Sequence, residues 1–298
     1  MNRIIDYLNN NQIPYKQNEP MKLHTTFKTG GEADVFVSPE NEEQLSELLT
    51  FCKGEEIKPF IIGNGSNLLV DDCGIDGVVI EIGDGFDFLE LTDETTIIAG
   101  AGTSLAKLCR FALSNSLAGL EFAFGIPGSV GGAAFMNAGA YGGEMKDVVS
   151  KVNHLTSDGK PGCLYGDELS FGYRKSAYSE NGFVVTSVVF KLQKGEKSEI
   201  EAKMNELLQR RKDKQPLEFP SAGSVFKRPE GYFAGALIEQ SGLKGKRIGG
   251  AMVSEKHAGF IINYDNATTA DVRELIAFCQ KTVFEKFGVE LKTEIRMV

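Results

Sequence analysis

The feature that most constrains the fold is an apolar, glycine-rich stretch in the middle of the chain, residues 119–143. It holds eight of the chain's 34 glycines, including the run from Gly125 to Gly132 (GIPGSVGG). A flexible linker is rich in glycine and serine and poor in apolar side chains, which does not describe this stretch. Glycine permits left-handed backbone and close approach of other atoms. We therefore expect a buried, tightly turned segment whose backbone closely approaches something else.

Two further glycine turns follow apolar runs in the same way. Residues 63–67 (GNGSN) follow Phe60–Ile62, and residues 100–103 (GAGT) follow Thr95–Ala99. Such turns can point backbone N–H groups at a phosphate, and several in one α/β unit suit a dinucleotide bridged by a pyrophosphate. Spacing alone leaves open that they are only tight turns. The chain has neither G-x-x-x-x-G-K-[ST] nor G-x-G-x-x-G, so neither a P-loop nor a standard Rossmann site is supported.

Length and charge exclude several classes of protein. The 298 residues suggest about two domains, or three small ones. A net charge of −9 argues against a general nucleic-acid or membrane-surface binder, because both require a basic face. No apolar run is long enough to span a membrane, and the N-terminus is not a signal peptide. The five scattered cysteines predict reduced thiols in core positions of a cytoplasmic protein, without disulfides or zinc.

Periodicity predicts a mixture of helices and strands, hence the α+β class. The first 20 residues read as a short helix that ends before Pro14 and a linker, and Asn41 with Gln44 resembles a capping box for the next helix. A polar segment at 194–198 marks a domain boundary. Further helices are expected around residues 45–52, 105–112, 200–211, 234–241 and 272–283, and strands at 60–62, 68–70, 78–82, 86–91, 95–99, 148–155, 183–192, 252–253, 260–262 and 291–297.

Several polar residues outside the glycine turns could carry chemistry. Ser224 stands close to Lys227 and Arg228, and Arg210 lies one helical turn before Lys214. Two cations on one face could hold a diphosphate, although a solvated basic helix end explains them equally well.

Three other positions stand in short polar groups or alone. The Tyr173-Arg174 pair could bind an anion or be a surface loop. Glu294 could face a cleft or belong to a solvent-facing row. His257 stands alone, as structural histidines often do.

Taken together, these residues resemble the UDP-N-acetylenolpyruvoylglucosamine reductase family of bacterial cell-wall flavoenzymes. The resemblance runs from about Leu23 to the end of the chain, and its parts occur in the family's order. The first three blocks together indicate an FAD-binding fold of the vanillyl-alcohol oxidase type, and the block with Ser224 and the late Glu294 indicate the reductase. The blocks are residues 25–31 (TTFKTGG), 63–70 (GNGSNLLV), 125–132 continuing to 137–142 (NAGAYG), 172–176 (GYRKS), 220–229 (PSAGSVFKRP), 249–250 and Glu294.

The resemblance implies an α+β fold with a two-subdomain FAD-binding unit and a C-terminal substrate-binding domain. The implied divisions are residues 1–75 and 76–195 for the FAD subdomains and 196–298 for the substrate domain. It implies non-covalent FAD, with NADPH as co-substrate. The reaction would reduce the enolpyruvyl group of UDP-N-acetylglucosamine enolpyruvate to UDP-N-acetylmuramate, for peptidoglycan synthesis. We expect a cytoplasmic monomer without nucleic-acid or membrane partners.

The resemblance also assigns roles to matching residues. Ser224 would be the general acid that protonates the substrate carbon, and Arg174 and Glu294 would assist at the enolpyruvyl carboxylate. No metal is implied. Substrate contacts would come from Tyr173, Arg210, Lys214, Arg228 and His257. Cofactor contacts would come from Gly63, Asn64, Gly65, Ser66, Asn67, Leu68, Gly125, Ile126, Pro127, Gly128, Ser129, Gly131, Gly132, Asn137, Gly139 and Ala140.

One departure and two alternatives belong to this interpretation. The chain has no room for the tyrosine-bearing insertion of the longer subtype, so it resembles the shorter one and the residue that closes the pocket is open. An FAD-dependent carbohydrate or alcohol oxidase is weakened because no His or Cys lies within 63–70 or 119–143 for covalent attachment. A non-catalytic nucleotide-sugar binding protein would not need Ser224 as an acid.

Overall fold

The computed structural model describes residues 2–298. They divide into two units, each built from several chain segments and each with its own hydrophobic core. Unit 1 comprises the residues up to Gln17, Val35–Asn64 and Gly77–Arg210. Unit 2 comprises Asn18–Asp34, Gly65–Asp76 and Arg211–Val298.

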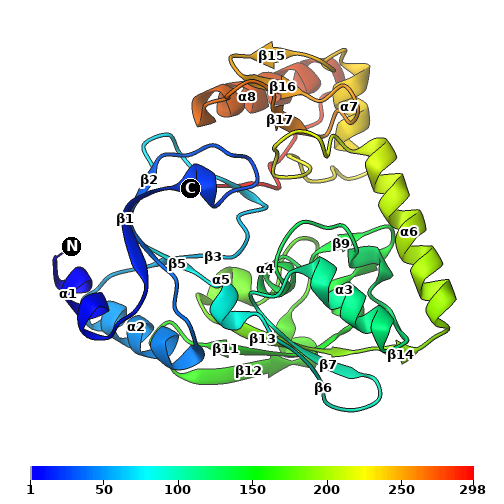
Figure 1. Ribbon diagram of the computed structural model, residues 1–298. Coiled ribbons are helices and arrows are strands. Elements are labelled where there is room, and N and C mark those ends of the chain that lie inside the picture. Colours follow the sequence, from blue (N-terminus) through cyan, green and yellow to red (C-terminus); the bar gives the residue numbers. More distant parts are fainter. Residues whose placement is uncertain (1) are drawn as a thin grey trace. The chain divides into compact units, whose positions relative to one another are not determined.

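The larger sheet of unit 1 has five strands, and every neighbouring pair is antiparallel. The order is β12 (Pro161–Tyr165), β11 (Val149–Leu155), β13 (Val184–Lys191), β7 (Thr96–Gly100) and β6 (Leu89–Leu91). Helix α4 (Val130–Phe135) packs on β13 and β7 and contacts α3 (Leu105–Ser114) (Figure 1). The buried face of α3 carries Leu105, Leu108, Cys109 and Ala112, as its periodicity predicts.

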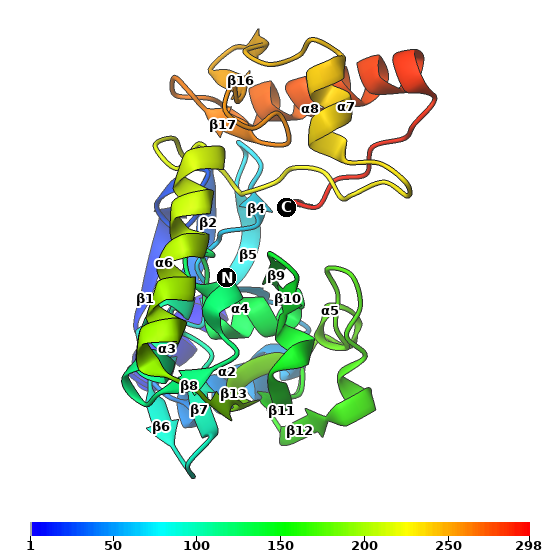
Figure 2. The same ribbon diagram turned by 90° about the vertical axis from the view of Figure 1, so that its right-hand side faces the viewer.

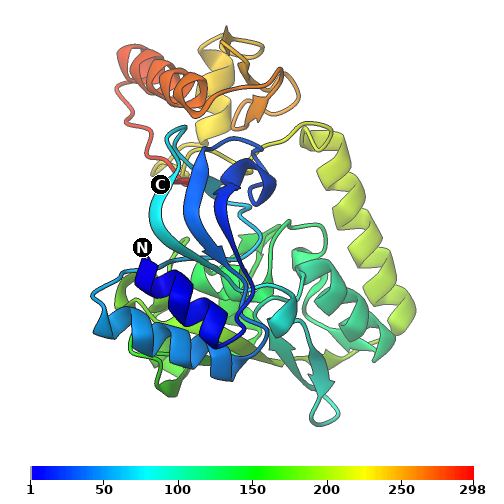
Figure 3. The ribbon, with the colours of Figure 1, turned by 60° about the vertical axis from the view of Figure 1, so that its left-hand side comes forward.

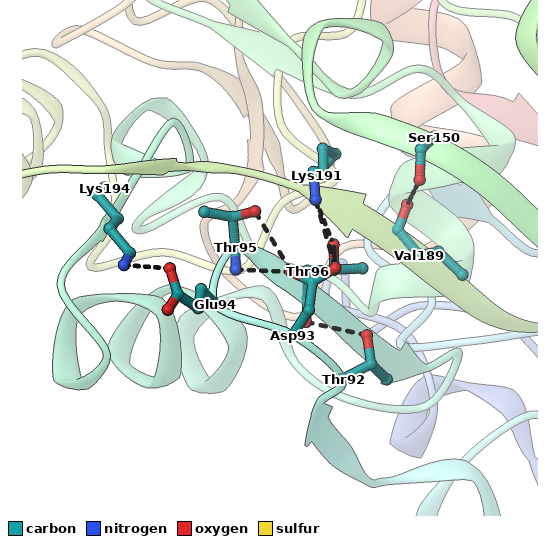
Figure 4. A network of polar contacts seen from close by, with 9 residues as sticks. All are labelled: Thr92, Asp93, Glu94, Thr95, Thr96, Ser150, Val189, Lys191 and Lys194. Atoms are coloured by element: carbon teal, nitrogen blue, oxygen red, sulfur yellow. Dashed lines mark hydrogen bonds and ion pairs between the residues drawn. The ribbon is translucent and has the colours of Figure 1, made fainter.

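The hairpin between β6 and β7 is closed by side chains rather than by glycine. Asp93 accepts hydrogen bonds from the Thr95 N–H at 2.8 Å and from the Thr96 hydroxyl at 2.9 Å, and Lys191 lies 3.4 Å from the same carboxylate (Figure 4). These interactions, led by the backbone N–H, lower the pKa of Asp93 to about 2. The predicted strand at 86–91 is shorter in the structure: residues 84–86 form a 3₁₀ turn, and only Leu89–Leu91 form a strand.

A second sheet has the order β1 (Tyr15–Pro20), β2 (Glu32–Val37), β5 (Ile75–Glu81), β3 (Phe60–Ile62). Three of the five boundaries between the units fall within β1, β2 and β5. Helices α1 (Asn2–Asn10) and α2 (Glu42–Gly54) lie side by side, with the Tyr7 and Phe51 rings stacked 4.0 Å apart (Figure 3). The predicted capping box is confirmed in its first half, since Asn41 accepts the Gln44 N–H at 2.9 Å, but the Gln44 side chain accepts the Glu40 N–H instead of that of Asn41.

The prediction of a linker before residue 20 is wrong, because Tyr15–Pro20 form strand β1. This strand is polar and only Glu19 in it is buried. It lies at the edge of its sheet, where backbone hydrogen bonds hold a strand that lacks an apolar face.

Unit 2 packs two helices with a three-stranded antiparallel sheet. Helices α7 (Ala234–Gln240) and α8 (Thr269–Phe287) lie side by side, and α8 contacts β15 (Arg247–Ile248) and β16 (Ala251–Val253), with β17 (Ile261–Asn263) beyond (Figure 2). The N-terminus of α8 is fully capped: the Asp72 carboxylate accepts the N–H groups of Thr269 at 2.8 Å and Ala270 at 2.9 Å, and the Thr268 hydroxyl accepts the next one.

The predicted last strand at 291–297 is wrong in extent. Only β18 (Arg296–Met297) is a strand, and it pairs in parallel with β4 (Leu68–Leu69). Before it, Thr293 forms an isolated bridge with Phe226, and the Leu291 carbonyl accepts the Gln280 amide. The partners change within a few residues, so no continuous ladder forms.

The remaining elements are short, apart from one long helix. None of the described helices is long and apolar enough to cross a membrane. The elements are β8 (Leu117–Ala118), β9 (Gly139–Ala140), β10 (Gly143–Glu144), α5 (Tyr178–Asn181), β14 (Gln193–Lys194) and α6 (Lys197–Lys214).

The prediction that all cysteines fill core positions is wrong for two of them. Cys52, Cys109 and Cys279 are buried, and burial raises their thiol pKa values to about 11, 12 and 12. Cys73 and Cys163 are exposed, because Cys73 lies in the loop after β4 and Cys163 on the outermost strand, β12.

Candidate functional site

Unit 1 brings together the start of the first glycine turn, Gly63 and Asn64, and the whole of the other two turns. Ser104, just after the second turn, forms a β-bridge with Ser129 in the third. A Cβ added to Gly131 would lie 2.8 Å from the Ala101 Cβ, and one added to Gly63 would lie 2.6 Å from the Ser129 hydroxyl. The predicted close approach is therefore confirmed: each turn touches another, and side chains at these glycines would clash.

The same place offers main-chain donors. Gly125 and Gly128 have φ of +86° and +143°, which glycine tolerates best. No described residue accepts a hydrogen bond from the N–H groups of Gly128 and Ser129. Backbone donors among small residues fit the diphosphate of a dinucleotide. Within the glycine stretch, however, residues 130–135 form helix α4 rather than a turn, and the Ser129 hydroxyl caps it.

The continuation of the first turn lies in unit 2. A Cβ on Gly65 would lie 2.0 Å from the His24 carbonyl, so only glycine fits there. The Asn67 amide donates to the Glu294 carbonyl at 3.2 Å. Leu68 is buried in β4, so its side chain belongs to the core.

Asn137 uses its side chain to connect two loops. Its amide nitrogen donates to the Glu144 carboxylate at 2.9 Å and to the Gly172 carbonyl at 3.0 Å, and its oxygen accepts the Lys146 N–H at 2.9 Å. Asn137 is buried and has φ of +43°. These bonds join the β9–β10 hairpin to the turn that carries Arg174, and the cofactor contact of Asn137 stays a prediction.

Arg174 occupies a strained position in that turn. Gly172 and Lys175 pair across it, and Arg174 has φ of +56°, a left-handed conformation that costs a non-glycine residue about 1–2 kcal/mol. Its guanidinium donates to the Gly139 carbonyl at 3.2 Å and lies 5.5 Å from the Tyr173 ring. Strained residues of this kind cluster at functional sites.

Arg210 lies against the tip of the same hairpin. Its guanidinium is 5.0 Å from the Tyr141 ring, and Glu206 is 3.5 Å away on the preceding turn of α6. Tyr141 also has positive φ, at +53°. The hairpin thus contacts both Arg174 and Arg210. Tyr141 is not among the predicted site residues, although its ring contacts Arg210. Its only signal is its place in the two-residue turn between β9 and β10.

In unit 2 the main chain brings Ser224 and Glu294 together. Val225 donates to the Gly259 carbonyl at 2.9 Å and accepts the Glu294 N–H at 2.7 Å. Ser224 itself bridges to Phe260. Both Ser224 and Glu294 are half-buried, and the Ser224 hydroxyl makes no hydrogen bond to another described residue. Two residues far apart in sequence therefore become neighbours.

His257 lies beside Ser224. A Cβ on Gly259 would lie 3.1 Å from His257 Nδ1 and 3.2 Å from Ser224 Oγ. Nδ1 accepts the Gly259 N–H at 3.1 Å, which places the proton of the neutral ring on Nε2. Burial lowers the pKa of His257 and outweighs a backbone hydrogen bond that raises it; the charges of Lys244 and Lys214 also lower the pKa, and that of Glu239 raises it.

Of the other predicted cations, one lies on a helix and one lies outside the helices and strands. Lys214 ends helix α6, as predicted. Arg228 is exposed, with its guanidinium 4.0 Å from the Phe233 ring. Arg211, which the sequence did not single out, is buried and bonds to Gln215 at 3.3 Å. Arg174 and Ser224 lie in different units, and their meeting at one substrate stays a prediction.

Comparison with known proteins gives two family matches. Residues 215–298 match the C-terminal domain of UDP-N-acetylenolpyruvoylglucosamine reductase, and residues 33–161 match an FAD binding domain. A protein of that name from Caldanaerobacter subterraneus subsp. tengcongensis is 53% identical over 94% of this chain and 92% of its own. The chain belongs to the UDP-N-acetylenolpyruvoylglucosamine reductase family.

Other members agree over nearly the full length. The Listeria monocytogenes serotype 4a reductase is 51% identical over 96% of this chain and 95% of its own. The crystal structure of UDP-N-acetylenolpyruvylglucosamine reductase from Thermus caldophilus is 38% identical, covers 96% of this chain and 98% of that one, and superimposes with a TM-score of 0.81. The predicted α+β fold, with an FAD-binding unit and a family-specific C-terminal domain, is confirmed.

Proposed function

We propose that this protein reduces the enolpyruvyl group of UDP-N-acetylglucosamine enolpyruvate to give UDP-N-acetylmuramate, using NADPH and bound FAD. The observation that supports the proposal is the main-chain hydrogen bond from Glu294 to Val225, the residue after Ser224, in a chain of this family. FAD, when bound, supplies the hydride chemistry. The glycine turns fit its diphosphate, because they offer backbone donors where side chains would clash.

The chain's own residues supply placement and charge. The Ser224 hydroxyl holds a proton at Oγ for the substrate carbon. Negative charge develops on the enolpyruvyl carboxylate during the addition, and the Arg174 guanidinium, held by the Gly139 carbonyl, stabilises charge of that sign. Glu294 assists beside the acid. Tyr173, Arg210, Lys214, Arg228 and His257 are proposed to bind the nucleotide sugar.

The organisation around this site is part of the same proposal. We place the FAD subdomains at residues 1–75 and 76–195 and the substrate domain at 196–298. The proposed cofactor contacts are residues 63–68, 125–129, 131, 132, 137, 139 and 140. A cytoplasmic monomer of the shorter subtype completes the proposal.

The test is an anaerobic absorption spectrum of the purified protein, taken alone, after NADPH, and after the enolpyruvyl sugar. A yellow protein that NADPH bleaches and the sugar recolours supports both half-reactions. A protein that stays bleached with the sugar has another substrate. A colourless protein that takes up no added FAD contradicts the proposal and leaves a binding protein. Reduction by a sugar or alcohol, with reoxidation by oxygen, would indicate the oxidase instead.

A further inference from the structure

The loop before β2 contacts the loop after β3 and the segment that carries Ser224. The Thr26 N–H donates to the Gly65 carbonyl at 3.3 Å, and the Thr26 hydroxyl donates to the Ser221 carbonyl at 2.7 Å. Thr26 thus bonds both Gly65, in the second half of the first glycine turn, and Ser221, three positions before Ser224. All of these residues belong to unit 2.

The segment from Pro220 to Lys227 is otherwise held by main-chain bonds. Its Pro220 carbonyl accepts the Asn263 N–H at 2.9 Å, and Lys227 donates to the Lys292 carbonyl at 2.8 Å. Between these anchors, Gly223 has φ of +76° and its position is open on the Cβ side. The Thr26 hydroxyl supplies a side-chain bond at the bend that precedes Ser224.

We propose that Thr26 is a positioning residue for Ser224, which acts by holding the Ser221 carbonyl in register with the Gly65 loop. This inference rests on the proposed function, in which that loop binds FAD and Ser224 is the acid. The Asn67 amide, which holds the Glu294 carbonyl at 3.2 Å, is a parallel contact from the same loop. The loop from Gly65 to Asn67 therefore holds both parts of the proposed acid site: the segment of Ser224 through Thr26, and Glu294 through Asn67.

The physical expectation is a selective loss in one half-reaction. Protonation requires the donor within hydrogen-bond reach of the substrate carbon, and a displacement of about 1 Å at a reacting group can cost about 100-fold. Loss of one tether out of several should displace Ser224 by less. For Thr26→Val, which keeps the shape and removes the hydroxyl, we expect sugar-driven reoxidation to slow about tenfold. Reduction by NADPH and the affinity for FAD should stay within about twofold of the wild type.

A matched control is the neighbouring Thr25. Its hydroxyl bonds to the Thr29 carbonyl at 3.2 Å, within its own turn, and Thr25 is buried. Thr25→Val therefore makes the same chemical change one position away without touching Ser221. Thr26→Ser restores the hydroxyl and should restore the reoxidation rate.

A structural readout makes the test independent of turnover. In the FAD-loaded protein, hydrogen exchange of the amides at residues 221–226 should accelerate in Thr26→Val and stay unchanged in Thr25→Val and Thr26→Ser. The two rates are measured by stopped-flow absorbance of the flavin on the same preparations. Selective slowing of reoxidation with faster exchange, both reversed by serine, supports the proposal.

Other outcomes overturn it. Unchanged reoxidation and exchange in Thr26→Val mean that the hydroxyl positions nothing. Equal slowing in Thr25→Val means that the turn matters only as a whole. Loss of FAD, or slowing of both half-reactions, means that Thr26 acts on the cofactor. If the wild type itself is bleached by NADPH but not recoloured by the sugar, the proposed function fails, while the exchange data still report on the tether.

Discussion

Replacement of Asn137 should destabilise unit 1 by more than the loss of one exposed asparagine. Each of the three hydrogen bonds of its side chain contributes about 1 kcal/mol to the free energy of unfolding. The value is moderate because the partner groups are partly exposed, so water can bond them once the asparagine is removed. The φ of +43° adds a cost for any residue that tolerates the left-handed region poorly. Summing the three lost bonds and about 1 kcal/mol of strain, we expect Asn137→Ala to lower the free energy of unfolding by about 4 kcal/mol.

Two variants separate the two contributions. Asn137→Gly removes the side chain but adopts positive φ easily, so its cost should be that of the three bonds alone, about 3 kcal/mol. Asn266 has φ of +49° and an exposed side chain that bonds only to its neighbour Asp265, so Asn266→Ala reports the strain alone, about 1 kcal/mol. The assay is urea denaturation followed by circular dichroism at one fixed FAD concentration, because a ligand of the folded state raises its stability.

The sign of a charge gives a further check. Asn137→Asp keeps an oxygen that accepts the Lys146 N–H. It replaces the amide NH₂, which donates to the Glu144 carboxylate and the Gly172 carbonyl, by an oxygen that repels both. It should be less stable than Asn137→Gly at pH 7 and recover as the pH falls and the new carboxyl takes up a proton. If Asn137→Ala unfolds at the same urea concentration as Asn266→Ala, the bonds add nothing and the reasoning is refuted.

Four further outcomes are expected. Ser224→Ala should keep FAD and its bleaching by NADPH but lose most sugar-driven reoxidation in stopped-flow experiments; normal turnover would remove Ser224 as the acid. Glu294→Gln should impair reoxidation more than reduction in the same traces, and equal damage would indicate a structural role. Burial lowers the pKa of His154 below its ordinary 6.5, so the unfolded chain takes up the proton first and the urea midpoint should fall as the pH drops below 6.5, less so in His154→Gln. Asp72→Ala should cost about 1–2 kcal/mol of unfolding free energy, measured by the same denaturation, because two N–H groups of α8 lose their acceptor.

Local patterns predicted the elements whose partners lie close in sequence or whose faces are strongly apolar. The buried positions of α8, from Val272 to Val283, follow the helical period that the sequence shows. Glycine turns are likewise a local signal, since positive φ and close approach restrict the residue itself. Their meeting depends instead on distant partners, since Ser129 bridges to Ser104 and lies against Gly63.

The features that the sequence did not reveal depend on distant partners. Tyr15–Pro20 have no apolar alternation, and only the neighbouring strand makes them a strand. The role of Asn137 depends on the Gly172 carbonyl, 35 positions away. No local pattern shows that an asparagine will bond a carbonyl so far along the chain. The unit boundaries within β1, β2 and β5 are invisible for the same reason.

The neighbourhood of Ser224 also bears on which chemistry its hydroxyl can perform. A serine beside a histidine suggests a nucleophile activated by a base, which requires an imidazole nitrogen that accepts the hydroxyl proton. In this protein His257 Nδ1 already accepts the Gly259 N–H, and the neutral ring carries its proton on Nε2, where it is a donor. Burial lowers the pKa of His257 and so favours that neutral ring. His257 Nδ1 is therefore already occupied and does not serve as a base for the Ser224 hydroxyl, which agrees with the proposed role of Ser224 as a general acid rather than an activated nucleophile.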